Sequence, residues 1–374
     1  MKIGIDISQI VYQTGVSRYT CQLVKHLLEI ESHHQFYLFG GSLRQKSILK
    51  SYISSLMPVK AKSLNWSLTW LSPALADLFF NQLNLLSVDR WLPDLDVFHA
   101  SNWAIPKTKA KLITTIHDLT FIKLPQSHTL KSLKVHTRHL NRAKKMADMV
   151  ITDSISTQKD LIEFGFHKNK LKVIYPAPAG IFKPLKNKSK IQQIKQKYGL
   201  QTGFILSVGT HEPRKNLSKL IKAYDQLSSP KPILAIAGKF GWGEKAKSVS
   251  GVQLLGFVPD EDLVGLYSSA KAFIYPSLYE GFGFPVLEAF ACGCPVVTSN
   301  LSSLPELGGQ AALYIKNPRQ INQITKAIKT ILKLDFYQRK AIIQKGLIQA
   351  NRFSWTKTAR QTLKIYEEIN DHRH

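Results

Sequence analysis

Two glutamates, Glu280 and Glu288, are separated by seven residues in "YEGFGFPVLEAF", a run otherwise rich in glycine, phenylalanine and proline. A buried carboxylate is costly unless it is paired or binds a ligand. Pro285 suits the start of a helix and Gly293 its C-terminal cap, which predicts a helix over about residues 285–292. Glu280 then lies in the preceding loop and Glu288 in the first turns, both near the positive end of the helix dipole. Capping or an ordinary surface position would explain Glu288 alone, so we interpret the pair as ligand-binding.

A second charged motif, "VGTHEPRKNL", places Arg214 and Lys215 after an apolar strand pattern and before a helix expected near Asn216. Cations beside a helix N-terminus suit phosphate groups, because charge and free backbone N–H groups act together. An adjacent Arg-Lys pair is most often a solvated basic loop. The position at a strand end favours phosphate binding here.

His117 directly follows the strand pattern "KLITTI". It could be a hydrogen-bonded turn residue or a site residue, with Asp118 either orienting the imidazole or capping the next segment. The acidic "DLD" at residues 94–96 raises the question of a metal site. Pro93 precedes it, however, and a turn leading into a strand is the better interpretation, so no metal is expected.

Charge and length bound the class of protein. The 374 residues exceed a comfortable single core, which predicts two domains. Lys and Arg outnumber Asp and Glu by 51 to 25, a net charge of +26, which favours phosphate-rich partners such as nucleic acid, an anionic membrane surface or a nucleotide substrate. No nucleic-acid-binding module is recognisable, so nucleic acid is not an expected partner.

Cysteine usage and hydropathy predict a location. The three cysteines, Cys21, Cys292 and Cys294, have no zinc-ligand spacing and form no disulfide framework, as in a reduced cytosolic protein. The N-terminal "MKIGIDISQI" is no secretory signal. The apolar stretch at residues 63–86 contains Asn65 and Asp77 and is too polar to span a bilayer. Its part from Trp66 to Leu86 is expected to be a packed helical segment. We therefore expect a cytoplasmic protein, with peripheral contact on the inner membrane face as the second possibility.

Strand and helix patterns alternate along the chain and position these residues. Five strand patterns, from "KIGIDI" to "MVITDS", precede the Pro-marked linker "YPAPAGIFKPLKNKSK", and five more, from "GFILSVGT" to "PVVTSN", follow it. Such alternation predicts two doubly wound α/β domains with parallel sheets. Ligands of such sheets bind outside the carboxyl ends of the strands, where the loops that carry His117, Arg214 and Glu280 are expected.

The run "EGFGFPVLE" resembles the glutamate, seven residues, glutamate motif of the retaining glycosyltransferases of family 4. Other segments similar to that family follow in the family order, among them "TGVSRY", "TIHDLTF", "VGTHEPRKNL" and "FSWTKTARQTLKIYEEI". The resemblance covers nearly the whole chain and is weakest over residues 42–93. It implies the GT-B fold: two Rossmann-like domains, residues 1–178 and 179–355, with a cleft between them and a C-terminal helix, 356–374, that returns to the first.

The resemblance also implies roles for the charged residues. Glu288 would bind the ribose of a nucleotide-sugar donor, and Glu280 would hold the transferred sugar. Arg214 and Lys215 would neutralise the leaving diphosphate. The backbone N–H groups implied to help hold the sugar are those of Gly281, Phe282 and Gly283.

Further implied contacts come from both halves of the chain. His117 would contact the sugar near the reacting carbon. Gly15 would let the loop after the strand pattern "KIGIDI", here called the first loop, approach the diphosphate. Thr210 stands where many members have an arginine, a charge that Arg214 is expected to supply instead. The residues implied at the base and along the pocket are Phe240, Gly241, Phe257 and Val258.

The implied activity is a metal-independent, retaining α-glycosyl transfer without a cofactor. The donor would be GDP-mannose first, a UDP- or ADP-sugar second, and the acceptor a glycan or lipid-linked sugar in cell-surface polysaccharide synthesis. Fixed cations stabilise the charge that develops on the diphosphate. Two other classes stay open on the residues alone: a glycoside hydrolase using the two glutamates, and a non-catalytic nucleic-acid binder.

Overall fold

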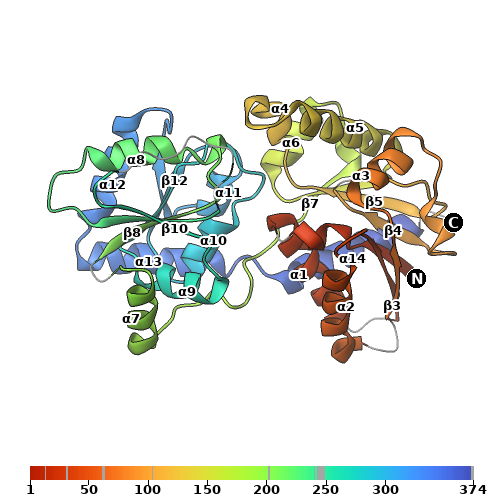
Figure 1. The fold of residues 1–374 in the computed structure, drawn as a ribbon, viewed down its shortest axis with the longest axis horizontal. Helices are drawn as coiled ribbons and strands as arrows, with labels where there is room; N and C mark the ends of the chain where they lie inside the picture. Colours follow the sequence, from red (N-terminus) through yellow and green to blue (C-terminus); the bar gives the residue numbers. More distant parts are fainter. Residues whose placement is uncertain are drawn as a thin grey trace. The chain divides into compact units, whose positions relative to one another are not determined.

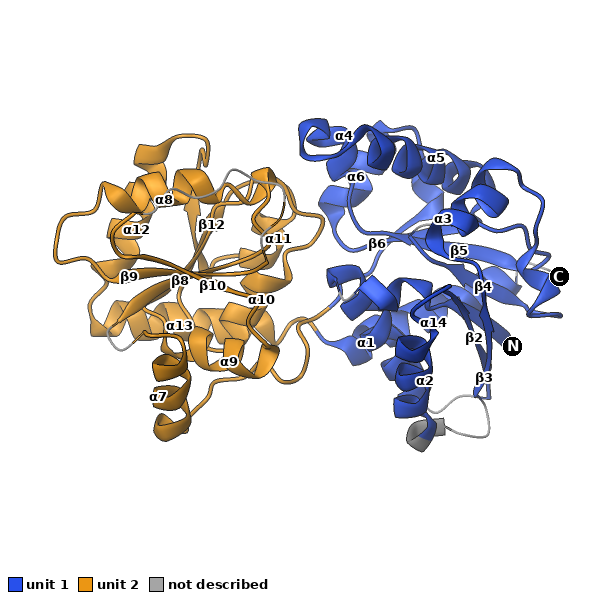
Figure 2. Cartoon of the chain, viewed as in Figure 1, with its two compact units in different colours: residues 1–176, 354–374 blue, residues 177–353 orange. Residues whose placement is uncertain are grey.

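The computed structural model describes the chain except residues 13, 31–32, 61–63, 103, 201–202, 240, 242–248 and 372–374, and the side chains of 58–60. The chain forms two compact units (Figure 2). Unit 1 comprises Met1–Pro176 and Ser354–His374, and unit 2 comprises Ala177–Phe353. Each unit contains one parallel sheet with helices on both faces (Figure 1).

Unit 1 is built on a seven-stranded sheet in the order β3-β2-β1-β4-β5-β6-β7. The strands are β1 (Lys2–Asp6), β2 (Gln35–Gly41), β3 (Leu64–Thr69), β4 (Val97–Ala100), β5 (Lys111–Ile116), β6 (Met149–Thr152) and β7 (Leu171–Val173). Ile3 lies opposite Phe36 on one side and Val97 on the other, all in parallel register and all fully buried. The strand order reverses between β1 and β4, which marks the ligand-binding position of such a sheet.

The helices of unit 1 cover both faces of its sheet. They are α1 (Gly15–Glu29), α2 (Lys46–Lys60), α3 (Pro73–Ala76), α4 (Thr120–Lys123), α5 (Leu130–Met146), α6 (Ile155–Glu163) and α14 (Trp355–Asp371), with the π-helix η2 (Asp77–Gln82) and the short 3-10 helices η1 (Ser8–Tyr12), η3 (Val88–Arg90), η4 (Pro125–Ser127) and η5 (Lys168–Lys170). The C-terminal helix α14 buries Trp355 and Tyr366 and packs against α1. The expected return of the C-terminal helix to the first domain is therefore confirmed.

Unit 2 has a six-stranded parallel sheet in the order β10-β9-β8-β11-β12-β13. The strands are β8 (Phe204–Val208), β9 (Ile233–Ala237), β10 (Val252–Gly256), β11 (Ala272–Tyr275), β12 (Val296–Ser299) and β13 (Ala312–Ile315). The helices are η6 (Pro213–Lys215), α7 (Lys188–Lys197), α8 (Leu217–Asp225), α9 (Asp260–Ser269), α10 (Phe284–Ala291), α11 (Leu304–Gly308), α12 (Ile321–Leu332) and α13 (Phe336–Ala350). The order reverses between β8 and β11, so the loops after these two strands occupy the ligand-binding position of this sheet.

One expectation about local structure is wrong. The segment from Trp66 to Leu86 is expected to be helical, yet its first residues belong to strand β3, which precedes α3 and η2. Asn65, Ser67 and Thr69 alternate with larger apolar residues, and this period of two suits an edge strand. None of the helices among the described residues is long and apolar enough to cross a membrane.

Candidate functional site

The loops after β8 and β11 are joined by direct hydrogen bonds at the carboxyl edge of the unit 2 sheet. Asn216 has a left-handed backbone (φ 59°) and precedes α8, as expected for the helix start. Its side-chain Nδ2 donates to the carbonyl oxygens of Pro276 (3.2 Å) and Pro318 (2.7 Å). The Leu278 N–H donates to the carbonyl oxygen of Arg214 at 2.8 Å. These bonds fix the basic loop against the glutamate loop.

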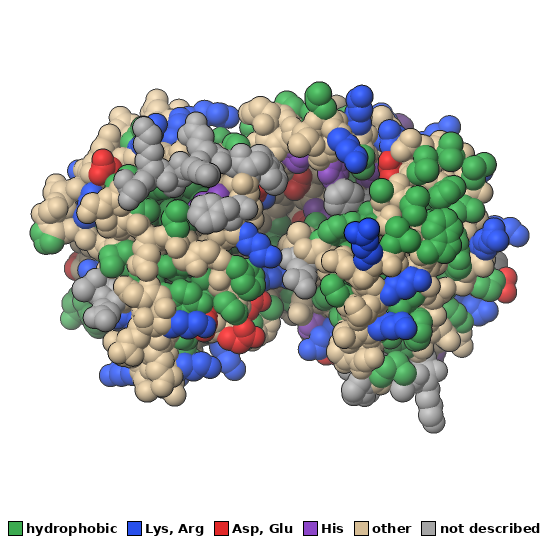
Figure 3. Space-filling model, viewed as in Figure 1, with side chains coloured by type: hydrophobic (Ala, Val, Ile, Leu, Met, Phe, Trp, Pro, Cys, Tyr) green, Lys and Arg blue, Asp and Glu red, His purple; other side chains and the backbone are tan. Residues whose placement is uncertain are grey.

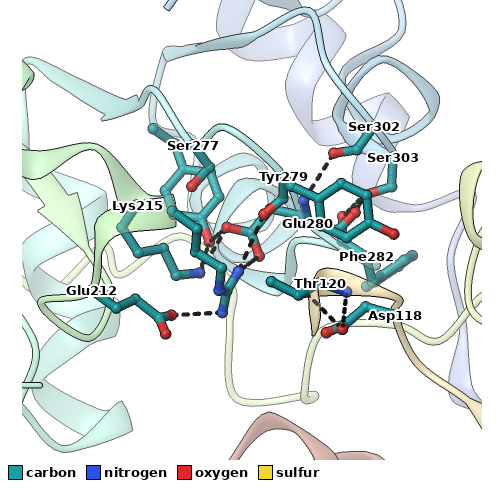
Figure 4. Close-up of polar contacts among 12 residues, drawn as sticks. Asp118, Thr120, Glu212, Lys215, Ser277, Tyr279, Glu280, Phe282, Ser302 and Ser303 are labelled. Atoms are coloured by element: carbon teal, nitrogen blue, oxygen red, sulfur yellow. Dashed lines mark hydrogen bonds and ion pairs between the residues drawn. The ribbon is translucent and has the colours of Figure 1, made fainter. Parts of the chain in front are cut away.

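The two predicted cations both pair with Glu280 (Figure 4). Glu280 Oε2 accepts from Arg214 Nη1 at 2.5 Å, and Oε1 accepts from Lys215 Nζ at 2.7 Å and from the Tyr275 hydroxyl at 2.8 Å. Glu212 adds a second carboxylate, 2.7 Å from Arg214 Nη2. The cluster therefore contains two cations and two carboxylates, a balance of charge that the sequence analysis did not anticipate.

Burial by itself would raise the pKa of Glu280, but the charges of Arg214 and Lys215 outweigh it and lower that pKa to about 2. Burial and then the neighbouring Arg214 lower the pKa of the Lys215 ammonium, against the opposing effect of Glu280. Glu280 is thus ionised throughout the physiological range. A general acid needs a raised pKa, so this geometry does not suit the acid role that a glycoside hydrolase would require.

The backbone between Glu280 and α10 is held by two serines that follow β12. The Glu280 N–H donates to Ser302 Oγ at 2.9 Å, while Ser303 Oγ donates to the carbonyl oxygens of Glu280 (2.9 Å) and Phe282. Within the described chain, no acceptor pairs with the N–H groups of Phe282 and Gly283. These two N–H groups lie at the N-terminus of α10, where an anion or a sugar hydroxyl would be stabilised.

Glu288 lies on α10 and is only 3% exposed. Its Oε2 accepts a hydrogen bond from the Tyr267 hydroxyl of α9 at 3.2 Å. Burial, and then the charge of Glu288, raises the pKa of Tyr267. The alternative of an ordinary surface glutamate is therefore wrong for Glu288.

The remaining predicted donor contacts of unit 2 lie in loops at the same edge. Thr210 is exposed directly after β8, and a Cβ on Gly241 would lie 2.7 Å from the carbonyl oxygen of His211. Phe257 is 63% exposed with the Lys239 ammonium 5.1 Å from its ring centre, whereas the neighbouring Val258 side chain is buried. Phe240 lies outside the described residues.

His117 follows β5 in unit 1 and is buried, with Asp153 and Tyr19 against its imidazole. Its Nδ1 lies 2.7 Å from Asp153 Oδ2, and the Tyr19 ring meets its imidazole edge-on, 4.7 Å between ring centres. Asp118 instead accepts from the Thr120 N–H (2.9 Å) and hydroxyl (2.6 Å). Asp118 is therefore bonded to Thr120, the first residue of α4, and no hydrogen bond among the described residues joins its side chain to the imidazole.

Asp153 is a site candidate that the sequence analysis missed. A signal was present, because "MVITDS" ends in an acidic residue just as "KLITTI" is followed by His117. Strands β5 and β6 are neighbours, with Ile116 opposite Thr152, so the residues that follow these two positions lie side by side. Only the strand order makes this pairing visible.

Gly15 is the first residue of α1 and is exposed. Apart from its chain neighbours and its own helix backbone, a Cβ built on it would meet no described atom within 4 Å. The open space is compatible with close approach of a ligand, which is the role that the sequence suggested.

The cysteines and acidic residues offer no evident metal centre. Burial raises the pKa of the Cys294 thiol to about 12, and Cys292 is buried as well. No group of three His, Cys, Asp or Glu side chains in the described part of the chain is placed to hold a metal ion.

Comparison with known proteins shows the family. The chain matches Glycosyltransferase Family 4 over residues 13–177 and Glycosyl transferases group 1 over residues 190–368. The O-antigen chain mannosyltransferase B of Escherichia coli is 31% identical across 98% of this chain and 100% of its own length. The O-antigen chain mannosyltransferase RfbU of Salmonella typhimurium is 29% identical across 62% of this chain and 63% of its own.

Solved structures agree on the fold. The Anabaena protein Alr3699/HepE, in complex with UDP and glucose, superposes with a TM-score of 0.72 at 20% identity, covering 98% of this chain and 99% of its own. WaaG, a glycosyltransferase involved in lipopolysaccharide biosynthesis, gives 0.63 at 15% identity, with 98% and 99% coverage. The fold is GT-B. The chain belongs to the family 4 glycosyltransferases and is a glycosyltransferase.

Proposed function

We propose that this glycosyltransferase is a retaining α-mannosyltransferase that takes mannose from GDP-mannose and extends a glycan or lipid-linked acceptor in cell-surface polysaccharide synthesis. The full-length similarity to an O-antigen chain mannosyltransferase supports the sugar and the pathway class. The observation that carries the chemistry is the buried cluster of Arg214, Lys215 and Glu280 at the carboxyl edge of the unit 2 sheet.

In the proposed reaction, the bond between the sugar anomeric carbon and the diphosphate oxygen breaks, and negative charge develops on the diphosphate. The Lys215 ammonium has three N–H donors. Among the described residues, Glu280 and Tyr275 accept two of them, which leaves the third for a phosphate oxygen. One such fixed donor is typically worth about 3 kcal/mol of transition-state stabilisation. The two cations would thereby make a divalent metal unnecessary.

For retention, we propose that the acceptor hydroxyl attacks the anomeric carbon on the face from which the diphosphate leaves. The departing phosphate oxygen accepts the hydroxyl proton, so no protein base is consumed. Glu280 is held by two cations, which weakens it as a nucleophile and suits it to accept hydrogen bonds from the sugar. Glu288 would bind the ribose, and His117 would contact the sugar beside the reacting carbon.

A panel of nucleotide sugars tests the donor. Thermal unfolding of the full chain would be followed with GDP-mannose, UDP-glucose and ADP-glucose, together with release of each nucleoside diphosphate in the presence of acceptor. GDP-mannose is expected to raise the unfolding midpoint most, because a ligand that binds only the folded state stabilises that state more the more tightly it binds. A larger shift and turnover with UDP-glucose would replace mannose by the second candidate donor.

Replacing Lys215 by alanine tests the diphosphate assignment. We expect transfer to fall by about 10²–10³-fold, the usual effect of removing one fixed donor to a developing anion, while the chain still folds. Lys219→Ala is the matched control, because Lys219 also lies near the start of α8 but is only partly buried and donates to the Arg319 carbonyl. Initial rates and circular dichroism are measured for both. Full activity of Lys215→Ala would remove this residue from the mechanism.

A further inference from the structure

Unit 1 carries a group of exposed apolar side chains, Leu43, Trp66, Trp70, Leu83 and Leu85, here called the apolar surface. Their exposed fractions are 58, 48, 47, 50 and 68%. Figure 3 shows hydrophobic side chains gathered on unit 1, with Lys and Arg side chains near them. Exposed tryptophans and leucines in one region usually mark a surface that a partner covers.

Contacts join these residues into one area. The Trp70 and Phe79 rings meet edge-on at 5.8 Å, and the Leu85 N–H donates to the Phe79 carbonyl oxygen at 3.0 Å. The Ser42 N–H, next to Leu43, donates to the Thr69 carbonyl oxygen at 3.3 Å, next to Trp70. Trp66 lies on the edge strand β3, and Trp70 directly follows that strand.

Acidic charge is almost absent here. Residues 32–88 contain a single acidic residue, Asp77. Asp77 is 6% exposed, and its Oδ2 accepts from Arg138 Nη1 at 2.6 Å and from Gln82 Nε2 at 2.9 Å. The segment that carries the apolar surface therefore presents no exposed carboxylate.

Helix α5 places positive charge beside the apolar surface. At 100° per residue, five of its basic residues share one face, here called the basic stripe: Lys131, Lys134, Arg138, Arg142 and Lys145. Arg138 reaches Asp77 in η2, and Arg142 Nη2 donates at 2.5 Å to the Asn84 side chain, between Leu83 and Leu85. The three lysines are exposed, and α5 contains no acidic residue.

We propose that the apolar surface and the basic stripe form one docking surface for an anionic lipid bilayer. Tryptophan and leucine are the side chains that enter the headgroup boundary, and unopposed lysines are attracted to anionic lipids. A protein partner would leave the absence of exposed acids over 32–88 without a reason. This inference is independent of which sugar the enzyme transfers.

The position of this surface has a consequence for the acceptor. The Ile105 N–H, after β4, donates to Asn81 Oδ1 at 2.9 Å, and Arg142 Nε donates to the Ile105 carbonyl oxygen at 2.6 Å. The docking surface is thus fixed to the carboxyl edge of the unit 1 sheet, the edge that also carries His117. A lipid-linked acceptor held in the same bilayer would be presented to that edge.

Vesicle binding of the full chain, without donor, tests the proposal. We expect the protein to sediment with vesicles of phosphatidylcholine and phosphatidylglycerol, and less with phosphatidylcholine alone or at high salt. Trp70→Ser combined with Leu85→Ser, and separately Lys134→Glu combined with Lys145→Glu, should each weaken partition by about tenfold or more. Phe336→Ser with Tyr337→Ser is the apolar control, because these unit 2 side chains are 72 and 80% exposed.

Several outcomes would overturn the proposal. One is wild-type protein that does not bind anionic vesicles. Another is an apolar-surface variant that binds vesicles as well as the wild type. The third is an equal loss of vesicle binding in the Phe336 and Tyr337 control. If the wild-type protein forms a dimer and the double variant Trp70→Ser with Leu85→Ser is monomeric, the apolar surface binds a second copy of the chain instead. Quenching of tryptophan fluorescence by brominated lipid, expected in wild type and reduced in Trp70→Phe, supports the docking surface without relying on a polar substitution. Transfer to a detergent-solubilised acceptor should stay at the wild-type rate in the apolar-surface variant, which separates this proposal from the proposed function.

Discussion

At the scale of single residues, the pair His117 and Asp153 decides how the imidazole can act. Asp153 can only accept while it is ionised, so Nδ1 of His117 donates, and in the neutral imidazole Nε2 then carries the lone pair. Within the described chain, His117 Nε2 and Asp153 Oδ1 are buried without a hydrogen-bond partner. Each such atom costs about 1–3 kcal/mol, a cost that a ligand hydrogen bond would remove. We infer that Nε2 accepts from a sugar hydroxyl.

Asp153→Asn tests this positioning role. Asparagine can present either an amide oxygen or an amide N–H to Nδ1, so the tautomer and ring position are no longer fixed. We expect kcat to fall by about 10²-fold, as for a small misplacement of a reacting group, with little change in the donor KM. Combined with His117→Gln, the loss should be smaller than the product of the single losses, because both changes disable the same group.

Asp160→Asn serves as the control, since Asp160 is also buried but pairs with Lys123 at 2.8 Å. If Asp153→Asn lowers the melting temperature but leaves kcat at the wild-type value, Asp153 is a purely structural residue.

At the scale of elements, two glycines at helix starts have opposite surroundings. Gly283 precedes α10 with a φ of 115°, and a Cβ there would lie 2.9 Å from Leu304 Cδ2. Gly15 begins α1, and a Cβ there would meet no described atom within 4 Å beyond its chain neighbours and its own helix backbone. The first glycine is required by the fold, whereas the second leaves a space that the fold does not use.

Alanine at the two positions should therefore give opposite results. Gly283→Ala is expected to lower the free energy of unfolding by about 1–3 kcal/mol, because it strains the backbone and crowds a buried leucine. Gly15→Ala is expected to keep or raise stability by up to about 1 kcal/mol. It should nevertheless raise the donor KM, because the methyl group occupies the space beside the first loop. Chemical denaturation and steady-state kinetics on both variants check this, and an unchanged KM in Gly15→Ala would remove the first loop from donor binding.

At the scale of the whole molecule, the C-terminal helix α14 is hydrogen-bonded to the sheet of unit 1. His99 of β4 bonds to the Tyr366 hydroxyl of α14 through Nδ1 (2.6 Å) and to Thr115 through Nε2 (2.9 Å). Burial, and then the neighbouring His117, lowers the pKa of His99 to about 3. Burial, with a smaller effect of His136, lowers that of His139 to about 4. Two neutral histidines are thus built into unit 1.

These histidines predict how stability depends on pH. An unfolded histidine titrates near pH 6.5, so below that pH the unfolded chain binds more protons than the folded chain, and stability falls on acidification. For His99 the loss accumulates from about pH 6.5 down to about pH 3 and reaches the order of a few kcal/mol. Glu280 adds a loss of stability between its ordinary pKa of 4.5 and its lowered pKa of about 2, while the raised pKa values of Asp6 and Asp153 act in the opposite direction.

The unfolding midpoint of the full chain should therefore begin to fall near pH 6.5 and not only in the carboxylate range. His99→Gln should flatten the curve between about pH 6.5 and 4, whereas the exposed His167→Gln should follow the wild type. Thermal unfolding over a pH series measures both, and parallel curves for His99→Gln and wild type would contradict the assignment.

The strand patterns of the sequence were most informative where strands are buried on both faces. Strands such as β4 and β11 are apolar throughout and were recognised for that reason. The strands without such a pattern, β3, β7 and β13, all lie at sheet edges, where polar and apolar side chains mix. Their pairing with a neighbour, and not their own composition, makes them strands.

The order and spacing of the amino acids were enough to predict the family, the alternating α/β architecture and the residue types of the candidate site. Spacing and chemistry suffice for this, since Arg214, Lys215 and Glu280 each follow a recognisable strand pattern. Only the tertiary structure decided the partners. In the structure both cations form ion pairs with Glu280. The imidazole of His117 is paired with Asp153, whereas Asp118 accepts from Thr120. The physical reason is that strand order sets which loops meet at the carboxyl edge, and strand order depends on how whole helices and strands pack.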